Sequence, residues 1–245
     1  MISDLTDHTD FSEIYDGLSR QLIEQGRYVP EPPHQMQELG AEWDSWELSH
    51  VIFRYMVPEG VGRLQRDIQP NLPWAEDHFQ ERVSGDPMNP PPSAEYWPYA
   101  QREHKTDGKY SHTYPERMWS GKRMGIRFPH GDLDDLVTLL KREPHTRQAY
   151  LPIWFPEDLN AASQGERVPC TLGYHFMWRE GEMSMTYLIR SCDLVRYLRD
   201  DVYMACRLLQ WVCAQVDAEP GSLLMHIMSL HCFEGDLSRM GHADG

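Results

Sequence analysis

The stretch PCTLGYHFMWREGEMSMTYLIRSCD occupies residues 169–193 and contains two apolar segments with strand character, at 169–178 and 183–189. Between them lie the four residues REGE, a connection typical of a β-hairpin. Immediately after the second segment come Arg190, Ser191 and Asp193, polar residues that interrupt an otherwise apolar sequence. The stretch therefore predicts a β-hairpin that is followed by a group of polar side chains.

The sequence around this hairpin indicates further strands and helices. Residues 149–155 and 222–233 have strand character, and apolar residues recur at helical spacing between Val202 and Val216. Residues 132–142 (DLDDLVTLLKR) place their apolar side chains on one face of a helix that ends before Pro144. The second half of the chain is therefore expected to be built around a sheet.

The N-terminal half gives weaker signals. Residues 1–48 are polar and acidic, with a predicted helix over 11–25 and a proline break at 30–33. A short helix is predicted over 74–83, and it leads into a proline-rich stretch with aromatic residues at its end, over 87–98. Such a stretch is typical of an ordered loop and sometimes of a lid or pocket rim.

The composition indicates one folded, acidic domain over residues 1–245. The chain has 245 residues, 40% of them hydrophobic, so it can bury a sizeable core. Its formal net charge of −15 repels phosphate backbones and anionic lipids, which disfavours nucleic-acid and membrane partners. The five cysteines include no C-x-x-C pair, which argues against disulfides and a metal site. Without a signal or transmembrane segment, we expect a cytoplasmic protein, in the host cytoplasm if it is viral.

Cys170 is the first candidate for chemistry. A thiol at the start of an apolar strand can act as a nucleophile if nearby cations stabilise its thiolate, although most such cysteines are small core residues. Polar residues recur at Arg190, twenty positions later, then at Asp201 and at His231 in S-L-H. The basic residues are informative in so acidic a chain, because an anionic ligand needs arginines gathered locally.

These residues resemble, in order and spacing, the catalytic half of the thymidylate synthase family, over roughly residues 110–236. The motifs are P-C at 169–170, R-S-C-D at 190–193, a polar residue at Asp201 and His231, preceded by L-K-R-E-P-H-T-R at 140–147. The resemblance implies a three-layer α/β fold with a large mixed sheet that forms the interface of a homodimer. It also implies active sites shared between the two subunits.

The resemblance further implies covalent catalysis with 5,10-methylenetetrahydrofolate as co-substrate and no metal. Cys170 would add as a thiolate to C6 of a pyrimidine nucleotide, which makes C5 a carbon nucleophile. The 5′-phosphate would be bound by Arg190 and Ser191, by Arg147 from the partner subunit and, as a weaker candidate, by Arg27. Gln148 stands where the family usually has a second arginine, so one phosphate contact is missing.

Asp201 is the position expected to select the base. The family usually has asparagine here, whose amide matches the O4 and N3–H of uracil. Cytosine presents an N4 donor and an N3 acceptor instead, and a protonated aspartic acid can pair with both. Deoxycytidylate hydroxymethylases resemble the synthase but carry aspartate, and L-R-D-D with S-L-H looks most like the phage type. The alternative is that Asp201 only caps a helix beginning near Val202.

The resemblance gives roles to further residues. A glutamate on the 74–83 helix would be the general acid–base, with Glu81 preferred over Glu76. Asp193 would contact the folate pterin, Trp97 and Tyr114 would line the pocket, and His231 would bind the sugar 3′-hydroxyl. Phe233 replaces a usual tyrosine, so one expected hydroxyl contact to the sugar is absent.

The expected activity is therefore deoxycytidylate hydroxymethylation, in which water rather than hydride completes the transfer. Only fourteen residues follow His231, so we expect the C-terminal region that seals the synthase's folate site to be reduced and water to be admitted. The alternatives are a CMP hydroxymethylase of nucleoside antibiotic synthesis, a dUMP hydroxymethylase or divergent thymidylate synthase, and an inactive nucleotide-binding family member. Asp201 disfavours both uracil alternatives, and an intact Cys170 disfavours inactivity.

Overall fold

The structure is a computed structural model that describes residues 5–30, 41–98, 105–119 and 132–240. It contains the β-hairpin predicted from the sequence. Strands β7 (Thr171–Arg179) and β8 (Glu182–Ile189) pair antiparallel, with Arg179 opposite Glu182. The two turn residues, Glu180 and Gly181, have φ angles of 54° and 91°. Positive φ at both positions matches the right-handed twist of a two-residue hairpin. The hairpin prediction is confirmed.

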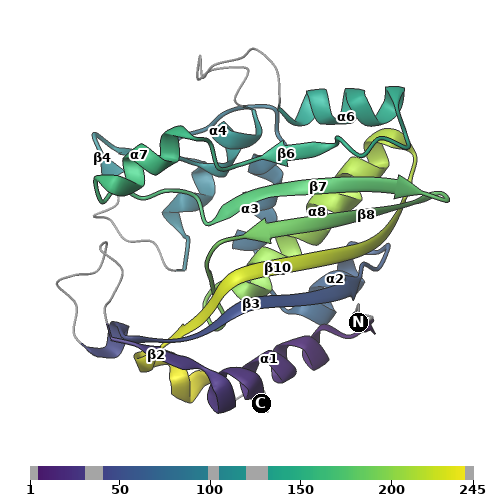
Figure 1. The fold of residues 1–245 in the computed structure, drawn as a ribbon. Coiled ribbons are helices and arrows are strands. Elements are labelled where there is room, and N and C mark those ends of the chain that lie inside the picture. The colour runs from purple at the N-terminus through teal and green to yellow at the C-terminus, as the bar shows by residue number, and fades with distance from the viewer. Residues whose placement is uncertain (1–4, 31–40, 99–104, 120–131, 241–245) are drawn as a thin grey trace.

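The hairpin belongs to an eight-stranded mixed sheet (Figure 1) with the path β1-β3-β10-β8-β7-β6. At its centre, β10 (Glu219–Phe233) runs parallel to β8 and antiparallel to β3 (Ser45–Met56). Four short strands complete it: β1 (Asp7–His8), β2 (Arg27–Val29), β6 (Tyr150–Pro152) and β9 (Cys192–Asp193). The expected α/β fold with a mixed sheet is confirmed.

Two strand predictions differ from the structure. The twelve-residue β3 was not predicted, although it pairs with β10 over most of its length. Its buried Val51, Phe53 and Tyr55 alternate with more exposed residues, as in a strand covered on one face. The strand predicted over 149–155 is shorter, because only Tyr150–Pro152 forms β6 at the sheet edge, where proline is tolerated.

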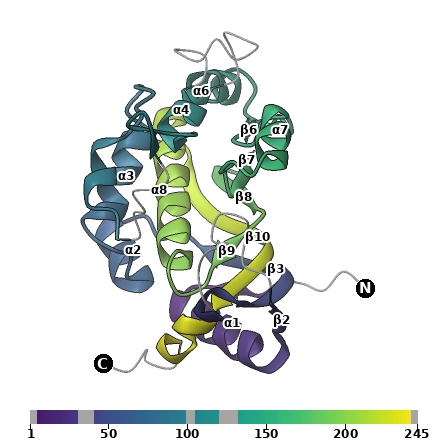
Figure 2. The same cartoon turned by 90° about the vertical axis from the view of Figure 1, so that its left-hand side faces the viewer.

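Helix α8 (Leu198–Val216) connects β9 to β10 and packs against β8 and β10. It begins four residues before the predicted start, at Leu198 rather than near Val202. Helices α2 (Val61–Ile68) and α3 (Trp74–Arg82) pack on α8 from the side away from the sheet (Figure 2). The layers are therefore the sheet, α8, and the α2–α3 pair.

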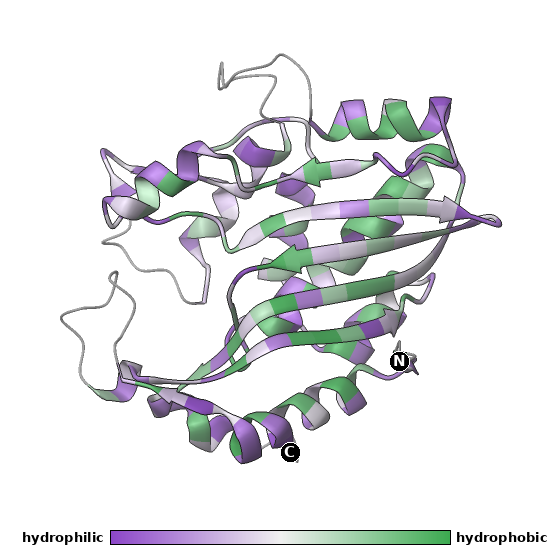
Figure 3. Cartoon of the chain, in the orientation of Figure 1, coloured by the Kyte–Doolittle hydropathy of each residue, from purple (hydrophilic) through white to green (hydrophobic). Residues whose placement is uncertain are grey.

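The remaining helices surround this arrangement. Helix α1 (Phe11–Gln25) matches its prediction and is capped by Asp10, and α6 (Leu133–Arg142) is capped by Asp132. Short elements are α4 (Tyr114–Met118), α7 (Glu157–Ser163), β4 (Lys105–Thr106), β5 (Lys109–Tyr110) and the 3₁₀ turns η2 (Ala41–Trp43), η3 (Pro92–Glu95) and η5 (Glu234–Arg239). Hydrophobic residues gather along the central strands and α8 (Figure 3), which share one core cluster.

Within the described ranges, no helix is long and apolar enough to cross a membrane.

The sheet face opposite α8 carries several accessible apolar side chains. Ile52 on β3, Met177 on β7 and Tyr150 on β6 are 44%, 38% and 42% exposed. On each strand, the neighbouring buried residues point toward the helices, so these three point away from them. This face is consequently available to an apolar surface of another chain.

Candidate active site

A cavity of about 560 Å³ lies where α3, α8, the 110–114 segment and the ends of β7, β8 and β10 meet. Eight residues selected from the sequence line it: Trp97, Tyr114, Cys170, Arg190, Ser191, Asp193, Asp201 and His231. The proline-rich stretch contributes Pro91, Ser93 and Ala94 to the wall, so it is an ordered part of the rim. Residues far apart in sequence therefore converge on one cavity.

The hairpin explains why Cys170 and Arg190 are neighbours. Thr171 pairs with Ile189 at the end of the hairpin, and the Arg190 N–H donates to the Cys170 carbonyl at 2.9 Å. The Arg190 guanidinium donates to the carbonyls of Pro169 (2.9 Å) and Val168 (3.1 Å), and its Nη2 lies 3.9 Å from the Cys170 Sγ. The cation is thus fixed beside the thiol.

The Cys170 thiol is not a ready thiolate in the free protein. Burial raises its pKa, and the charge of Asp201 raises it further, while Arg190 and Arg167 act in the opposite direction. A thiol of raised pKa is weakly nucleophilic until its surroundings change. Activation therefore has to accompany ligand binding in this cavity.

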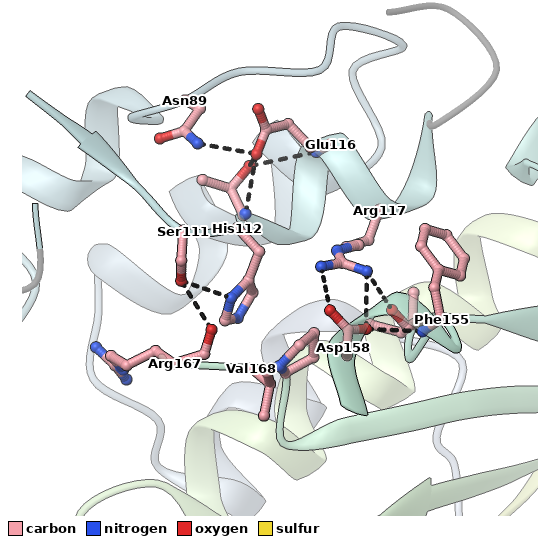
Figure 4. A network of polar contacts seen from close by, with 12 residues as sticks. Asn89, Ser111, His112, Glu116, Arg117, Phe155, Asp158, Arg167 and Val168 are labelled. Atoms are coloured by element: carbon pink, nitrogen blue, oxygen red, sulfur yellow. Dashed lines mark hydrogen bonds and ion pairs between the residues drawn. The ribbon is translucent and has the colours of Figure 1, made fainter. Parts of the chain in front are cut away.

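The chain before Cys170 is held by a network of polar contacts shown in Figure 4. The Ser111 Oγ donates to the Arg167 carbonyl at 2.9 Å and lies 3.1 Å from His112 Nδ1. Arg117 and Asp158 form a buried bidentate ion pair with N–O distances of 2.7 and 2.9 Å. Such a pair holds α4 against α7.

Asp201 lies in the first turn of α8, facing the cavity. Its N–H donates to the Tyr197 carbonyl at 2.8 Å, and Tyr197 occupies the N-cap position. The cap alternative for Asp201 is therefore wrong, because the helix begins earlier than predicted. The neighbouring Asp200 accepts two hydrogen bonds from Asn71, both 2.7 Å, whereas the Asp201 Oδ2 has the weak thiol donor of Cys192 at 3.6 Å.

The surroundings of Asp201 favour its protonated form. Burial raises the pKa of this carboxyl to about 7, and the charges of Asp200 and Asp193 also raise it against the lowering effect of Arg82. A carboxyl with this pKa is protonated in a large share of molecules near neutral pH. It can then donate one hydrogen bond and accept another.

The raised pKa predicts how Asp201→Asn changes stability with pH. The folded state keeps the proton up to about pH 7, whereas the unfolded chain loses it near pH 4, so wild-type stability falls as the pH rises between these values. Asparagine removes that loss. We expect the variant to be more stable by about 4 kcal/mol at pH 8, or roughly 8–16 °C in Tm, and equally stable at pH 4. Thermal unfolding at both pH values measures this, and equal Tm at pH 8 would contradict the raised pKa.

Asp193 presents a buried acceptor to the cavity. Its Oδ1 accepts from the N–H groups of Val195 and Arg196, both at 2.9 Å. Its Oδ2 is buried and accepts no hydrogen bond from the described residues, with the Arg196 Nε 3.8 Å away. A buried acceptor without a donor carries a free-energy cost that a ligand N–H can remove.

Aromatic rings flank this acceptor. Trp97 is stacked on Trp74 at 6.2 Å between centroids and tilted against Tyr197 at 6.2 Å. The buried Trp97 Nε1 has no hydrogen-bond partner among the described residues. Stacked rings with an unused donor and acceptor fit a flat heterocycle with amide-like edges, and a pterin is such a group.

His231 also lines the cavity, next to Asp193. It lies on β10 opposite Asp193 of β9, and its ring meets Phe233 edge-on at 5.3 Å. Burial lowers the pKa of His231, against the opposing charges of Asp193 and Glu47. The imidazole is therefore neutral near pH 7 and can accept or donate a hydrogen bond.

Neither candidate glutamate lines the cavity. Glu76 forms an ion pair with Arg207 at 2.9 Å and binds Tyr203, which ties α3 to α8. Glu81 faces the adjacent η3 turn, where its Oε1 accepts from the Ser93 N–H at 2.6 Å. Helix periodicity did not indicate which face of α3 borders the cavity, and a role of Glu81 in proton transfer stays a prediction.

Two expected phosphate ligands also lie away from the cavity of their own chain. Arg27 is exposed on β2, opposite Glu47 of β3. Arg147 is exposed between α6 and β6, where its carbonyl accepts from His175 Nε2 at 2.9 Å. Binding of the 5′-phosphate by Arg147 in the partner's site stays a prediction. Arg27 has no contact that supports its expected role in phosphate binding.

The sequence analysis missed several cavity residues. Helix α3 presents one face to the cavity through residues spaced four apart, which are Trp74, His78 and Arg82. This spacing is the sequence pattern from which they could have been predicted. The Arg82 guanidinium lies 4.0 Å from the centroid of the Tyr114 ring. Arg167 was also missed, because a lone arginine in a loop before Cys170 has no periodic pattern. Across the described residues, no cluster of His, Cys, Asp or Glu is arranged to hold a metal ion.

Comparison with known proteins gives consistent matches. The thymidylate synthase family profile matches residues 36–242. A putative thymidylate synthase of Methanosarcina barkeri is 26% identical over 55% of this chain and 57% of its own length, and one of Methanothermobacter thermautotrophicus is 28% identical over 52% and 60%. A thymidylate synthase of Rhizorhabdus wittichii is 24% identical over 80% of this chain and 59% of its own length. The chain thus spans less than two thirds of these relatives. From the profile match and the fold, the chain belongs to the thymidylate synthase family.

Proposed function

We propose that the protein is a deoxycytidylate hydroxymethyltransferase of the phage type. It converts dCMP, 5,10-methylenetetrahydrofolate and water into 5-hydroxymethyl-dCMP and tetrahydrofolate. Family membership supports folate-dependent one-carbon transfer to a pyrimidine nucleotide. The observation that carries the choice of base is Asp201, a carboxyl with a pKa raised to about 7 in the same cavity as Cys170.

The nucleotide is proposed to bind with its phosphate at Arg190 and Ser191 and its base at Asp201. In this position, protonated Asp201 donates to N3 and accepts from the N4 amino group of cytosine. Cys170 then forms the S–C6 bond, and the electron pair of the C5–C6 double bond moves to C5. The hydrogen bond from Asp201 to N3 stabilises the negative charge that develops in the ring.

The folate is proposed to bind against Trp97 and Asp193, where it supplies a one-carbon unit at the oxidation level of formaldehyde. Asp193 Oδ2 offers its unused acceptor to the pterin, and the rings of Trp74 and Trp97 orient it. Net reaction replaces the C5–H of dCMP by C5–CH2OH, and the S–C6 bond to Cys170 breaks at the end. No reductant is consumed, because water provides the hydroxyl group.

One alternative keeps a specific observation in its favour. Phe233 cannot offer a hydroxyl to the sugar, and its ring packs on His231, the expected ligand of the 3′-hydroxyl. CMP is therefore the second candidate substrate. A uracil substrate is disfavoured because its N3–H donor would face the Asp201 proton.

Trapping with 5-fluoro-dCMP tests the proposed reaction. Fluorine at C5 replaces the proton that has to leave, so the reaction stops after Cys170 and the one-carbon unit have both been attached. We expect intact-mass analysis to find one nucleotide and one folate covalently bound per active site, dependent on methylenetetrahydrofolate. Trapping by 5-fluoro-dUMP but not by 5-fluoro-dCMP would overturn the choice of base, and trapping by neither would favour a binding protein.

We further propose a homodimer formed through the open sheet face, with Arg147 completing the partner's phosphate site. Ile52, Met177 and Tyr150 give that face accessible apolar area, and Arg147 lies beside it through its bond with His175. Shared sites predict complementation. Arg147→Ala and Cys170→Ala should each be inactive, but mixing equal amounts should restore about a quarter of the sites, because half of randomly paired dimers carry one intact site. Activity after denaturation and refolding of the mixture measures this, and no restoration would contradict cross-subunit service.

A further inference from the structure

The proposed reaction requires a group in the cavity that takes the proton from C5 of the pyrimidine. Glu81, the residue first selected for proton transfer, does not line the cavity, although two of its partners, His78 and Ser93, do. Asp200 is held by Asn71 through both oxygens, and Asp193 Oδ1 is held by backbone N–H groups. Of the three α3 residues that line the cavity, Trp74, His78 and Arg82, His78 is the one whose neutral side chain has a lone pair that can accept a proton.

The hydrogen bonds of His78 fix its tautomer. Its Nδ1 lies 3.1 Å from the Glu81 Oε2 and 3.1 Å from the Ser93 Oγ. The Ser93 N–H and hydroxyl both donate to Glu81, so this carboxylate accepts and Nδ1 must carry the proton. The imidazole therefore has its lone pair on Nε2, which no described residue contacts by a hydrogen bond.

Packing holds the ring in this orientation. The imidazole is stacked on Trp74 at 5.2 Å with an interplanar angle of 17°, and Tyr114 meets it edge-on at 6.4 Å. Its Nδ1 edge faces Glu81 and Ser93, which leaves the Nε2 edge for the cavity. A base whose rotamer and tautomer are both fixed loses little freedom when it meets a substrate.

Electrostatics keep His78 neutral while Glu81 stays ionised. Burial and the charge of Arg82 lower the pKa of His78 to about 4, although Glu81 acts to raise it. For Glu81, burial raises the pKa, but the hydrogen bonds from His78 and Ser93 outweigh it, and the net direction is down. A neutral imidazole backed by a carboxylate has a lone pair to accept a proton, and Glu81 offsets part of the cost that burial and Arg82 place on the imidazolium formed.

We infer that His78 Nε2 takes the C5 proton of the pyrimidine and that Glu81 is the positioning residue behind it. This inference rests on the proposed function. The C5–H electron pair forms the exocyclic double bond as the tetrahydrofolate nitrogen leaves with its own pair, and the proton moves to Nε2. Water then adds through its oxygen to the exocyclic carbon, and the pair of the exocyclic double bond moves to C5. That pair re-forms the C5–C6 double bond as the S–C6 bond returns its own pair to sulfur. The imidazolium gives the C5 proton to the tetrahydrofolate nitrogen, and the proton released by water goes to the thiolate.

His78→Asn separates this role from binding and folding. The asparagine amide nitrogen can replace Nδ1 as the donor to Glu81, whereas nothing replaces Nε2. Trapping by 5-fluoro-dCMP precedes the proton step, so we expect the variant to trap like the wild type. Tritium release from 5-tritiated dCMP reports the proton step itself and should fall by about 10²-fold or more, with KM for dCMP unchanged.

Two further variants complete the test. Glu81→Gln keeps the size of the side chain but removes the charge, so kcat should fall by about tenfold, less than for His78→Asn, with KM unchanged. His8→Asn is the control, because His8 also contacts a glutamate, Glu13 at 3.4 Å, but lies outside the cavity. It should leave tritium release unchanged.

The outcomes distinguish the two proposals. A His78→Asn variant that traps normally and releases tritium within about threefold of the wild-type rate would overturn the assignment. So would a greater loss in Glu81→Gln than in His78→Asn, which would make Glu81 the base, or a failure of His78→Asn alone to trap. Absence of trapping in the wild-type protein would instead overturn the proposed function.

Discussion

Asp201→Asn is expected to move the substrate preference from dCMP to dUMP, changing the ratio of their kcat/KM values by about 10³-fold. Two contacts to the base edge reverse together, since asparagine offers a donor to O4 and an acceptor to N3–H. Each mismatched contact leaves a buried polar group unpaired, at a cost of about 1–3 kcal/mol. Steady-state kinetics with both nucleotides, on wild type and variant, measure the ratio.

The neighbouring Asp200→Asn is the matched control. Asp200 also lines the cavity, but both of its oxygens are bound to Asn71. We expect this variant to lose stability and to keep its preference for dCMP. If Asp201→Asn keeps the wild-type preference, or if Asp200→Asn changes it as strongly, Asp201 does not select the base.

Cys170→Ala should abolish turnover, with a loss of about 10⁴-fold or more, because Cys170 is the thiol beside Arg190 that is proposed to form the bond to C6. Affinity for dCMP should change by only a few fold, since the proposed binding contacts come from Arg190, Ser191 and Asp201. Product assays and calorimetric titration of dCMP separate the two quantities. A large loss of turnover with retained binding identifies a residue that acts in the chemical step.

Cys192→Ala provides the comparison for this loss. Cys192 is a second buried thiol of the cavity, 3.6 Å from Asp201, and the burial that raises its pKa makes it a poor nucleophile. This variant should retain trapping by 5-fluoro-dCMP. Turnover that persists in Cys170→Ala but disappears in Cys192→Ala would show that the nucleophile had been misassigned.

Elements with a strong periodic pattern could be predicted from the sequence. The 171–189 hairpin has apolar strands joined by a two-residue turn, and α6 repeats its leucines at helical spacing after an aspartate cap. Strand β3 could not be predicted in the same way. Its core residues Val51, Phe53 and Tyr55 alternate with Ile52, Arg54 and Met56, so hydrophobicity does not alternate regularly along it. The strand forms by pairing with β10, far away in sequence, as in the pair Arg54 and Leu224.

The site residues, like the strands and helices, could be predicted only where a local sequence pattern indicated them. Cys170 and Arg190 could be selected because the order and spacing of their motifs resemble the family, and the predicted hairpin brings the two residues together. His78 could not be found, because its role depends on which face of α3 meets the cavity and on Ser93, which comes from a separate turn. Glu81 was chosen by residue type and distance along the chain, and neither quantity specifies the direction of a side chain.

The most direct test of the central claim is to identify the product formed from each nucleotide. Purified protein is incubated with methylenetetrahydrofolate and, separately, with dCMP, CMP or dUMP, and the products are identified by mass spectrometry together with tritium release from C5. We predict 5-hydroxymethyl-dCMP as the main product, with tetrahydrofolate formed in equal amount. Formation of thymidylate from dUMP, with no product from dCMP, would contradict the account.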